Sequence, residues 1–178
     1  SNINILNELA KRNAGNPEKS KEYLTKSEED IQRISESLGD IVWNINPRYD
    51  DLQNLFIRMK RYAGDIKKKK NINYEMEFPE EADKITLTME KRRDFYLIFK
   101  EAINNLVKYS KATHANVRVK GDRKTISLII KDNGIGFDIS KVQYGNGLNN
   151  MKQRAAACNA IVEIISKRGA GTEVKLVM

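Results

Sequence analysis

Residues 125–137 read TISLIIKDNGIGF. The opening half, 125–130, alternates in polarity and then becomes wholly apolar, as a strand does when it enters a core. An aspartate, Asp132, follows this strand, and Gly134 and Gly136 come directly behind it. Glycines let a backbone approach its neighbours closely because they have no side chain. The stretch therefore predicts a buried strand that ends in a carboxylate and a close-packed loop.

Hydrophobic periodicity on both sides of this stretch predicts a mixture of helices and mostly hairpin-linked strands. The expected helices span 49–68, 89–109 and 146–157, and the expected strands span 72–78, 115–120, 125–131, 161–166 and 173–177. Elements in this order favour an α+β fold, a two-layer α/β sandwich with a mixed sheet of about five strands.

The first 47 residues have a different pattern. Apolar residues recur at steps of three and four from 20 to 45, which predicts one long helix with a single apolar stripe. A shorter helix is expected at 3–9, and the segment 13–17 breaks the chain between the two. We therefore expect an antiparallel helical hairpin over 1–47 and a second domain over 48–178, with Pro47 at the boundary.

The apolar stripe of this hairpin needs a partner, and pairing with a second copy of the chain into a four-helix bundle would cover it. We therefore expect a homodimer that forms through the hairpin. The stripe residues expected to meet across the dimer are Ile31, Ile34, Leu38, Ile41 and Ile45.

Composition narrows the class of protein. The single cysteine, Cys158, forms no internal disulfide, which favours a reducing, cytoplasmic setting. No run of about 18 apolar residues predicts a membrane span, so any anchoring in a membrane is expected to come from parts outside this chain. The net charge of +8 gathers in solvated helix ends such as 67–70, without a nucleic-acid-binding signature, and no direct nucleic-acid binding is expected.

The predicted helix 89–109 carries three polar residues beside its apolar face. At 100° per residue, Glu101, Asn105 and Lys108 fall in a stripe roughly 60° wide. An amide oxygen suits Mg²⁺, a lysine suits a phosphate, and a carboxylate suits a water or a proton. Asn104 lies about 60° from Glu101, away from the core, so Asn105 is the preferred ligand. Taken alone, the stripe is more typical of a solvated helix rim whose charges have no function.

Two further glycine-rich stretches bear on the site. Gly145 and Gly147 open the predicted helix 146–157, where free N–H groups can meet an anion, although a simple turn has the same pattern. The stretch 169–172 precedes the last strand and also reads as a turn. The chain contains neither a P-loop nor a complete dinucleotide fingerprint, so a nucleotide site here is built in another way.

Taken together and in order, four stretches resemble a known superfamily. EAINNLVKYS (101–110), DNGIGF (132–137), YGNGLNNMKQRA (144–155) and GAGTEVKLVM (169–178) are similar to the N box, the two glycine boxes and the closing Gly-Thr strand of the GHKL ATPases, which have the Bergerat ATP-binding fold. Within that superfamily, the chain from about residue 27 resembles two-component sensor histidine kinases, in the subfamily whose phosphoacceptor helix has a His-Asp pair.

The resemblance implies ATP and Mg²⁺ as cofactors and assigns roles to the residues of the motifs. Asp132 would accept a hydrogen bond from the adenine amino group, which would disfavour guanine. Asn105 would bind ATP and also hold the metal, and Glu101, one turn before it, would be the catalytic acid. The remaining implied ATP-binding residues are Lys108, Tyr109, Gly134, Gly136, Gly145, Gly147, Leu148 and Thr172.

The chain departs from the family pattern in two places. Tyr109 stands where the family usually has a histidine, and the lid between Phe137 and Gly145 is short, as in this subfamily. The first residues resemble the continuation of a phosphoacceptor helix, so the acceptor histidine is expected upstream of this chain. His114 does not match that motif and is expected to be a surface residue.

These residues are compatible with three functions. The first is an ATP-dependent histidine kinase of a two-component system that serves a response regulator. A GHKL serine kinase, such as an anti-sigma factor, would share the fold but lack the long hairpin. A partner- or nucleic-acid-binding module with a degenerate nucleotide site would fit the net charge and Tyr109, although the intact Glu101, Asn105 and Asp132 speak against it.

Overall fold

The computed structural model describes residues 2–45, 51–70, 72–81, 84–141 and 146–178. The chain divides into two compact units, Ser1–Pro47 and Arg48–Met178. Within the described residues, no helix combines the length and the apolar character needed to cross a membrane.

The first unit is a helical hairpin of α1 (Asn2–Arg12) and α2 (Pro17–Ile45). The amide oxygen of Asn16 accepts a hydrogen bond from the backbone N–H of Lys19 at 3.2 Å, so Asn16 caps α2. Pro17 occupies the first helical position, where a backbone N–H would have no partner within the helix, so the absence of this group from proline costs nothing. At the open end, Asn2 Nδ2 donates to Asp30 Oδ2 at 2.8 Å and ties the helices together. Both helices extend a few residues beyond the predicted ranges.

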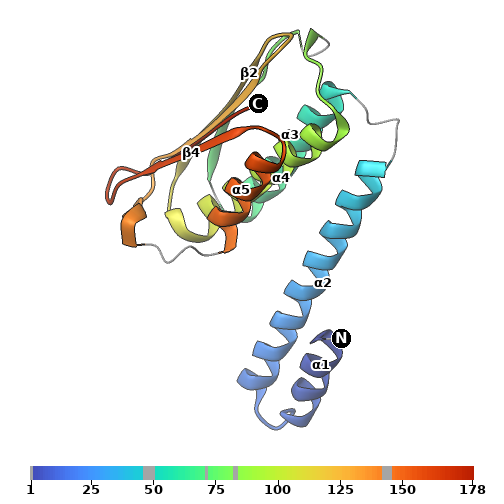
Figure 1. Ribbon diagram of the computed structural model, residues 1–178. Coiled ribbons are helices and arrows are strands. Elements are labelled where there is room, and N and C mark those ends of the chain that lie inside the picture. Colours follow the sequence, from blue (N-terminus) through green and yellow to red (C-terminus); the bar gives the residue numbers. More distant parts are fainter. Residues whose placement is uncertain (1, 46–50, 71, 82–83, 142–145) are drawn as a thin grey trace. The chain divides into compact units, whose positions relative to one another are not determined.

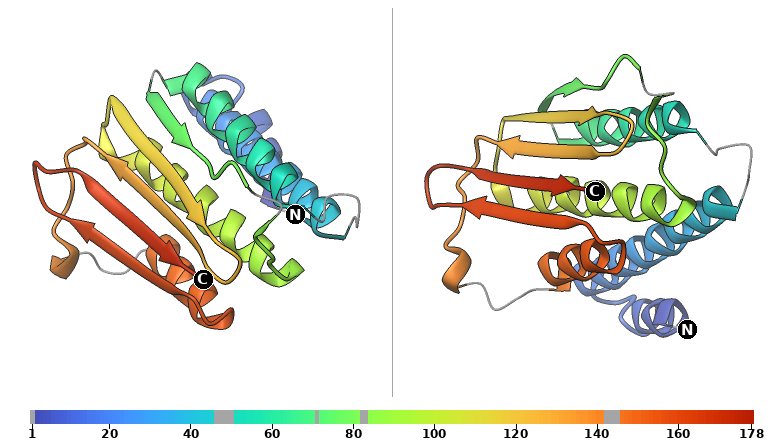
Figure 2. Two further views of the ribbon diagram at one scale, coloured as in Figure 1. Left: turned by 90° about the horizontal axis from the view of Figure 1, so that it is seen from above. Right: turned by 45° about the horizontal axis from the view of Figure 1, so that its top comes forward.

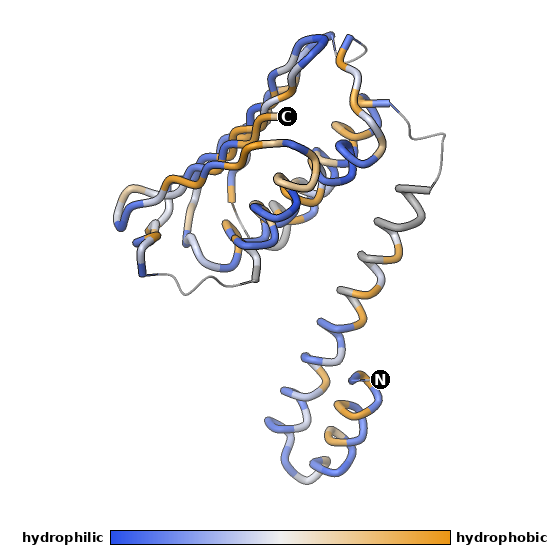
Figure 3. The backbone as a smooth tube through the Cα atoms, in the orientation of Figure 1, coloured by the Kyte–Doolittle hydropathy of each residue, from blue (hydrophilic) through white to orange (hydrophobic). Residues whose placement is uncertain are grey.

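An apolar stripe runs along α2, as the recurring hydrophobic positions in Figure 3 show. The side chains of Ile31, Ile34 and Leu38 are exposed by 51%, 51% and 57% within this chain. The side chains of Ile41 and Ile45, which were expected in the same stripe, lie outside the described residues.

The second unit contains a mixed five-stranded sheet, which confirms the predicted fold. Its strands are β1 (Asn73–Glu77), β2 (His114–Gly121), β3 (Ile126–Asp132), β4 (Ile161–Ser166) and β5 (Thr172–Val177). The strand order is β1-β2-β3-β5-β4, with β1 parallel to β2 and the remaining pairs antiparallel (Figure 1).

Three helices, α3 (Leu52–Lys70), α4 (Met89–Asn105) and α5 (Asn146–Ala157), cover one face of the sheet (Figure 2). Thr88 caps α4 by accepting a hydrogen bond from the Lys91 N–H at 3.3 Å. Between sheet and helices lies an apolar core whose fully buried members include Phe95, Ile98, Phe99, Ile103, Val117, Leu128 and Leu176. The predicted two-layer sandwich is therefore present, with its helices on one side.

The predicted helix 89–109 is wrong in its last turn, which is π-helical. The sequence predicted a single helix through 109, but α4 ends at Asn105 and continues as the π-helical turn η3 (Leu106–Ser110). Lys111, with φ of 54°, then ends the segment in the left-handed conformation. A π turn holds more residues than an α turn, so residues after Asn105 are rotated relative to a uniform helical wheel. Apolar spacing could not reveal this, because Leu106 is buried in either geometry. A short 3₁₀ turn, η4 (Ile139–Lys141), was also not predicted.

Candidate functional site

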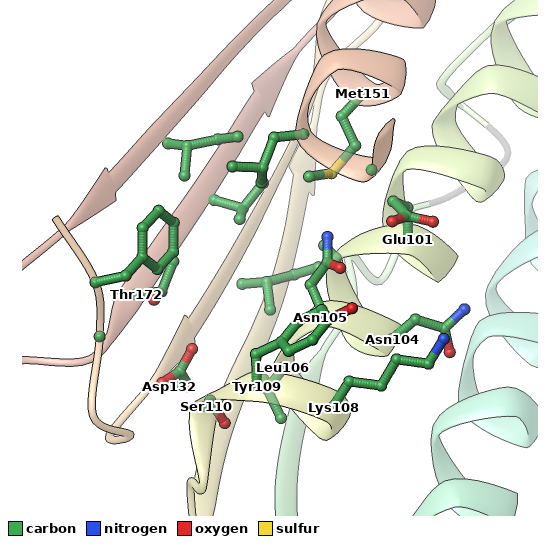
Figure 4. A pocket seen from close by; sticks show the side chains of 18 of the residues that line it. Glu101, Asn104, Asn105, Leu106, Lys108, Tyr109, Ser110, Asp132, Met151 and Thr172 are labelled. Atoms are coloured by element: carbon green, nitrogen blue, oxygen red, sulfur yellow. The ribbon is translucent and has the colours of Figure 1, made fainter. Parts of the chain in front are cut away.

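A cavity of about 560 Å³ lies between the C-terminal part of α4, the turn η3, the start of α5, and strands β3, β4 and β5. It brings together most of the residues that the sequence singled out: Glu101, Asn105, Lys108, Tyr109, Asp132, Gly136, Gly147, Leu148 and Thr172. Gly134 lies beside the cavity and does not line it, and Gly145 falls outside the described residues. Figure 4 shows Asp132 and Glu101 on different sides of this space.

Asp132 reaches the cavity because of strand periodicity. Ile126, Leu128 and Ile130 point from β3 into the core, and Asp132, two residues further on, faces the same side at the end of the strand. Only 7% of this residue is exposed. Burial raises the pKa of the Asp132 carboxyl, while hydrogen bonds from the backbone N–H groups of Gly134 and Thr172 oppose the rise. Asp132 is thus a buried acceptor held by the backbone.

The two glycines after Asp132 are required by close contacts. A Cβ atom on Gly134 would come within 2.7 Å of Ser110 Cβ, at the end of η3. The N–H of the next residue, Ile135, donates to the Ser110 carbonyl at 2.7 Å, so the loop lies flat on this turn. Gly136 has a φ of 55°, and a Cβ there would meet the carbonyl of Gly171 at 2.6 Å. Both positions therefore exclude a side chain.

Ser166 was missed by the sequence reasoning. Its hydroxyl donates to the Gly171 carbonyl at 3.0 Å, accepts from the Phe137 N–H at 2.9 Å, and lies 2.9 Å from Thr172 Oγ1. One serine at the end of β4 therefore joins the loop after Asp132 to the turn before β5. A serine at a strand end is too common in sequences to be recognised as such a link.

The other end of the cavity is built by α4 and α5. A Cβ atom on Gly147 would overlap Glu101 Oε1 and come within 3.3 Å of Asn105 Nδ2, so the first turn of α5 lies directly against both residues. Asn105 Nδ2 is buried and has no hydrogen-bond partner among the described residues. Rotation about the last side-chain bond exchanges the two ends of an amide, so the Asn105 oxygen can take the same place. A buried, unpartnered amide facing a cavity is suited to an external ligand.

The two neighbouring asparagines differ in their partners. The hydroxyl of Tyr62 in α3 donates to Asn104 Oδ1 at 2.6 Å. Asn104 Oδ1 is therefore occupied in a contact between α3 and α4, whereas Asn105 Nδ2 has no partner among the described residues. Figure 4 shows the two side chains pointing to different sides of the helix. The choice of Asn105 as the metal ligand stays a prediction.

The cavity has an exposed rim that carries Lys108 and Tyr109, and its walls are apolar. Lys108 and Tyr109 are exposed, Tyr109 by 68%, and lie on the η3 side. The walls are apolar side chains that the sequence reasoning did not assign to the site, because they are indistinguishable from ordinary core residues: Leu106, Ile130, Phe137, Met151, Ile164 and Val174. An apolar slot with a polar group at each end suits a flat ring that carries a charged tail.

His114 is exposed at the start of β2, as the sequence predicted, and does not line this cavity. Its ring Nδ1 lies 2.9 Å from the hydroxyl of Thr113. The amide of Asn133 holds this corner in place: its oxygen accepts hydrogen bonds from the N–H groups of both Thr113 and His114 at 3.0 Å.

Comparison with known proteins identifies the class. A family model described as histidine kinase-, DNA gyrase B- and HSP90-like ATPase matches residues 90–178, which is half of the chain. The chain belongs to this family, and the resemblance drawn from its four motifs is confirmed. The matched range contains the complete cavity lining described above.

Two similar proteins are a sensor histidine kinase and a sensor protein. Sensor histidine kinase LiaS of Bacillus subtilis is 34% identical over 82 residues, which cover 46% of this chain and 23% of LiaS. Sensor protein VraS of Staphylococcus saprophyticus is 35% identical over 82 residues, or 46% of this chain and 24% of VraS. The match thus spans about a quarter of each relative. The structure of Acinetobacter baumannii histidine kinase AdeS has the same fold, with a TM-score of 0.67, 15% identity, and coverage of 100% of this chain and 94% of that one.

Proposed function

We propose that this chain is the catalytic region of a sensor histidine kinase, which binds Mg-ATP and transfers the γ-phosphoryl group to a histidine outside this chain. The observation that carries the proposal is one cavity with two unlike polar ends: the buried carboxylate of Asp132 and the buried, unpartnered amide of Asn105. The family match and the sensor-kinase relatives support this choice of ligand and reaction.

The adenine ring would lie at the Asp132 end. Apolar walls such as Ile130 and Val174 offer surfaces for a flat ring, and the Asp132 carboxylate would accept a hydrogen bond from its amino group. Guanine has a carbonyl oxygen at the equivalent position, which would face the carboxylate without a donor between them, so ATP would be preferred to GTP. The backbone hydrogen bonds to Asp132 hold the acceptor in place before the ligand arrives.

The phosphates would lie at the other end, between Glu101, Asn105, Lys108 and the first turn of α5. Here the Asn105 oxygen and phosphate oxygens would hold Mg²⁺, a cation that takes few protein ligands, and the metal would neutralise charge on the phosphates. The fit rests on Asn105 Nδ2, which is buried without a partner among the described residues, and on the cavity that Glu101, Asn105, Lys108 and Gly147 line together. The Lys108 ammonium can contact a phosphate from the rim, and Glu101 can orient a water or accept a proton.

Phosphoryl transfer depends mainly on positioning and on stabilisation of charge, because the residues of the ATP site form no covalent bond to the transferred group. The polar end of the cavity, near the exposed Lys108, would hold the terminal phosphate where the imidazole of the acceptor histidine can reach it. The full protein is proposed to act as a homodimer through the hairpin, to serve a response regulator, and to work in the cytoplasm, with any membrane anchor outside this chain.

The proposal is tested by calorimetry and by phosphoryl transfer on the 178-residue chain. Mg-ATP should bind to the unmodified chain, and Mg-GTP should bind more weakly. A segment that carries a phosphoacceptor histidine, supplied on a second polypeptide, should then take up label from γ-labelled ATP. The label should be lost in acid, because phosphohistidine is acid-labile. Binding without any preference for adenine, or no binding at all, would contradict the proposal.

A further inference from the structure

Asp94, in the first half of α4, is a buried acid that the proposed reaction does not use. It is 3% exposed and does not line the cavity. Arg154 Nη1, from the second half of α5, lies 3.3 Å from Asp94 Oδ1. The neighbouring Arg93 also approaches, with its Nε 3.5 Å from the same oxygen, but Arg93 belongs to α4 itself. The Asp94–Arg154 pair is therefore the contact through which this acid reaches α5.

The distance along the helix between this ion pair and the Glu101–Gly147 contact is the same on α4 as on α5. Asp94 precedes Glu101 by about two turns of α4, and Arg154 follows Gly147 by about two turns of α5. The helices run antiparallel, so the two contacts lie at matching distances along a shared side. One marks the end at the cavity and the other marks the end remote from it.

The two contacts differ in how they resist displacement. Along the same side, α5 buries Met151 and Ala155, and apolar contacts of this kind tolerate small shifts because they have no directional partner. A buried carboxylate is different, since removing one of its cations leaves a poorly compensated charge. Sliding α5 by one turn, about 5.4 Å, would carry Arg154 away from Asp94. The ion pair therefore defines one axial position of α5.

We propose that the Asp94–Arg154 ion pair sets the position of α5 along α4, and thereby places the first turn of α5 at Gly147 over the phosphate end of the cavity. Asp94 and Arg154 are positioning residues, since neither touches the proposed ligand. The inference rests on the proposed function for its effect on Mg-ATP, whereas its effect on α5 is independent of any nucleotide.

The chain offers a matched control. Arg93→Gln removes one cation from Asp94 but leaves the contact with α5, while Arg154→Gln removes the cation that comes from α5. Both arginine side chains are similarly exposed, at 44% and 43%, so both substitutions should fold. Asp94→Asn keeps the shape of the buried side chain, and Arg154→Lys keeps the charge.

The first measurement is amide hydrogen exchange of α5 in the nucleotide-free chain. Exchange in the first turns of α5 should accelerate roughly tenfold in Arg154→Gln and in Asp94→Asn, and should be unchanged in Arg93→Gln. Arg154→Lys should restore part of the protection. Unchanged exchange in Arg154→Gln, or equal acceleration in Arg93→Gln, would overturn the inference, whatever the chain binds.

The second measurement is calorimetry with two ligands. Mg-ATP affinity should fall roughly tenfold in Arg154→Gln and no further in the double variant with Asp94→Asn, because the two residues act as one unit. Adenosine, which lacks phosphates, should bind to Arg154→Gln as it does to the unmodified chain. Equal loss of adenosine and Mg-ATP would indicate general damage and contradict the positioning role. Failure of the unmodified chain to bind Mg-ATP would reject the proposed function, while the exchange result would still decide the role of the ion pair.

Discussion

The backbone of Gly147 lies directly against the carboxylate of Glu101, without room for a side chain between them. The contact joins two sequence motifs that are separated by the whole of β2 and β3. A Cβ atom at this position would force the Glu101 carboxylate to move from its present place. The first turn of α5 therefore lies directly on side chains of α4 that line the candidate site.

Gly147→Ala should therefore weaken Mg-ATP binding, because the added methyl group meets Glu101 Oε1 and approaches Asn105. Calorimetry should show weaker binding of Mg-ATP, and the free energy of unfolding should fall by at most about 1–3 kcal/mol, the usual cost of overpacking. The matched control is Gly64→Ala in α3, where a Cβ would meet nothing within 4 Å. That change should leave binding intact and raise the free energy of unfolding by about 0.5–1 kcal/mol. Equal binding by both variants would contradict the role of Gly147.

Asp132→Asn should weaken ATP binding by about 1–3 kcal/mol, because the charged acceptor for the adenine amino group is lost. The substitution keeps the size of the side chain, so the fold should be retained, as circular dichroism can check. GTP binding should weaken less or improve, since the repulsion between two acceptors is removed. An unchanged ratio of ATP to GTP affinity would remove Asp132 from base recognition.

The pH dependence of ATP binding should follow the titration of Asp132. Burial raises the pKa of this carboxyl, so its ionised form, the hydrogen-bond acceptor, is lost at a higher pH than for an exposed aspartate. Affinity should therefore be complete well above that pKa and fall as the pH drops through it. Subtracting the pH profile of Asp132→Asn, measured by calorimetry, isolates this effect from the titration of the nucleotide. Identical profiles would show that another group controls it.

Asn105→Ala should abolish the Mg²⁺ dependence of ATP binding, because Asn105 Nδ2 is buried at the cavity without a partner among the described residues, which suits the amide to an external ligand. Asn104→Ala should keep that dependence and instead lower the free energy of unfolding by about 0.5–1.5 kcal/mol, through loss of the hydrogen bond from Tyr62. Tyr62→Phe removes the same hydrogen bond from the other side and should match Asn104→Ala. Loss of Mg²⁺ dependence in Asn104→Ala alone would reverse the assignment.

Leu38→Glu should reduce self-association of the hairpin, because it places a charge in the exposed apolar stripe of α2. Sedimentation equilibrium should show the unmodified chain as a dimer, or in a concentration-dependent equilibrium, and the variant shifted toward the monomer. Thr25→Glu adds the same charge at an exposed position on the opposite side of α2 and should leave association unchanged. A strictly monomeric unmodified chain at high concentration would contradict the proposed dimer.

The fold was largely predictable because it follows from periodicity. Alternation in β3 carries Ile126, Leu128 and Ile130 into the core, and the same alternation brings Asp132 to the cavity. The motif residues around Glu101, Asn105 and Gly147 could be singled out because four motifs occur in the order found in a known superfamily, whereas each motif alone is also compatible with a solvated helix rim or a turn. The mixed sheet and the covering helices follow from the order of the predicted elements.

Long-range contacts explain what the sequence did not reveal. The role of Ser166 depends on three partners that lie in different loops, and the hydrogen bond from Tyr62 to Asn104 joins helices distant in sequence. The apolar walls of the cavity resemble core positions because their side chains are chosen by the same hydrophobic burial. The ion pair between Asp94 and Arg154 requires the antiparallel packing of α4 and α5, which no local pattern specifies.

The π-helical turn η3 makes the length of the chain at 106–110 as important as its side chains. Ser110 is the last residue of this turn and its carbonyl accepts a hydrogen bond from the N–H of Ile135, so the loop that carries Asp132 is anchored to the end of the turn. Deleting one residue would let the helix continue with ordinary α spacing. Ser110 would stay close to the Ile135 N–H, because four residues at α spacing turn the chain about as far as five residues in a π turn. A one-residue deletion in this segment should consequently keep the anchor of the loop that carries Asp132, while the side chains at the cavity rim, such as those of Lys108 and Tyr109, point in new directions.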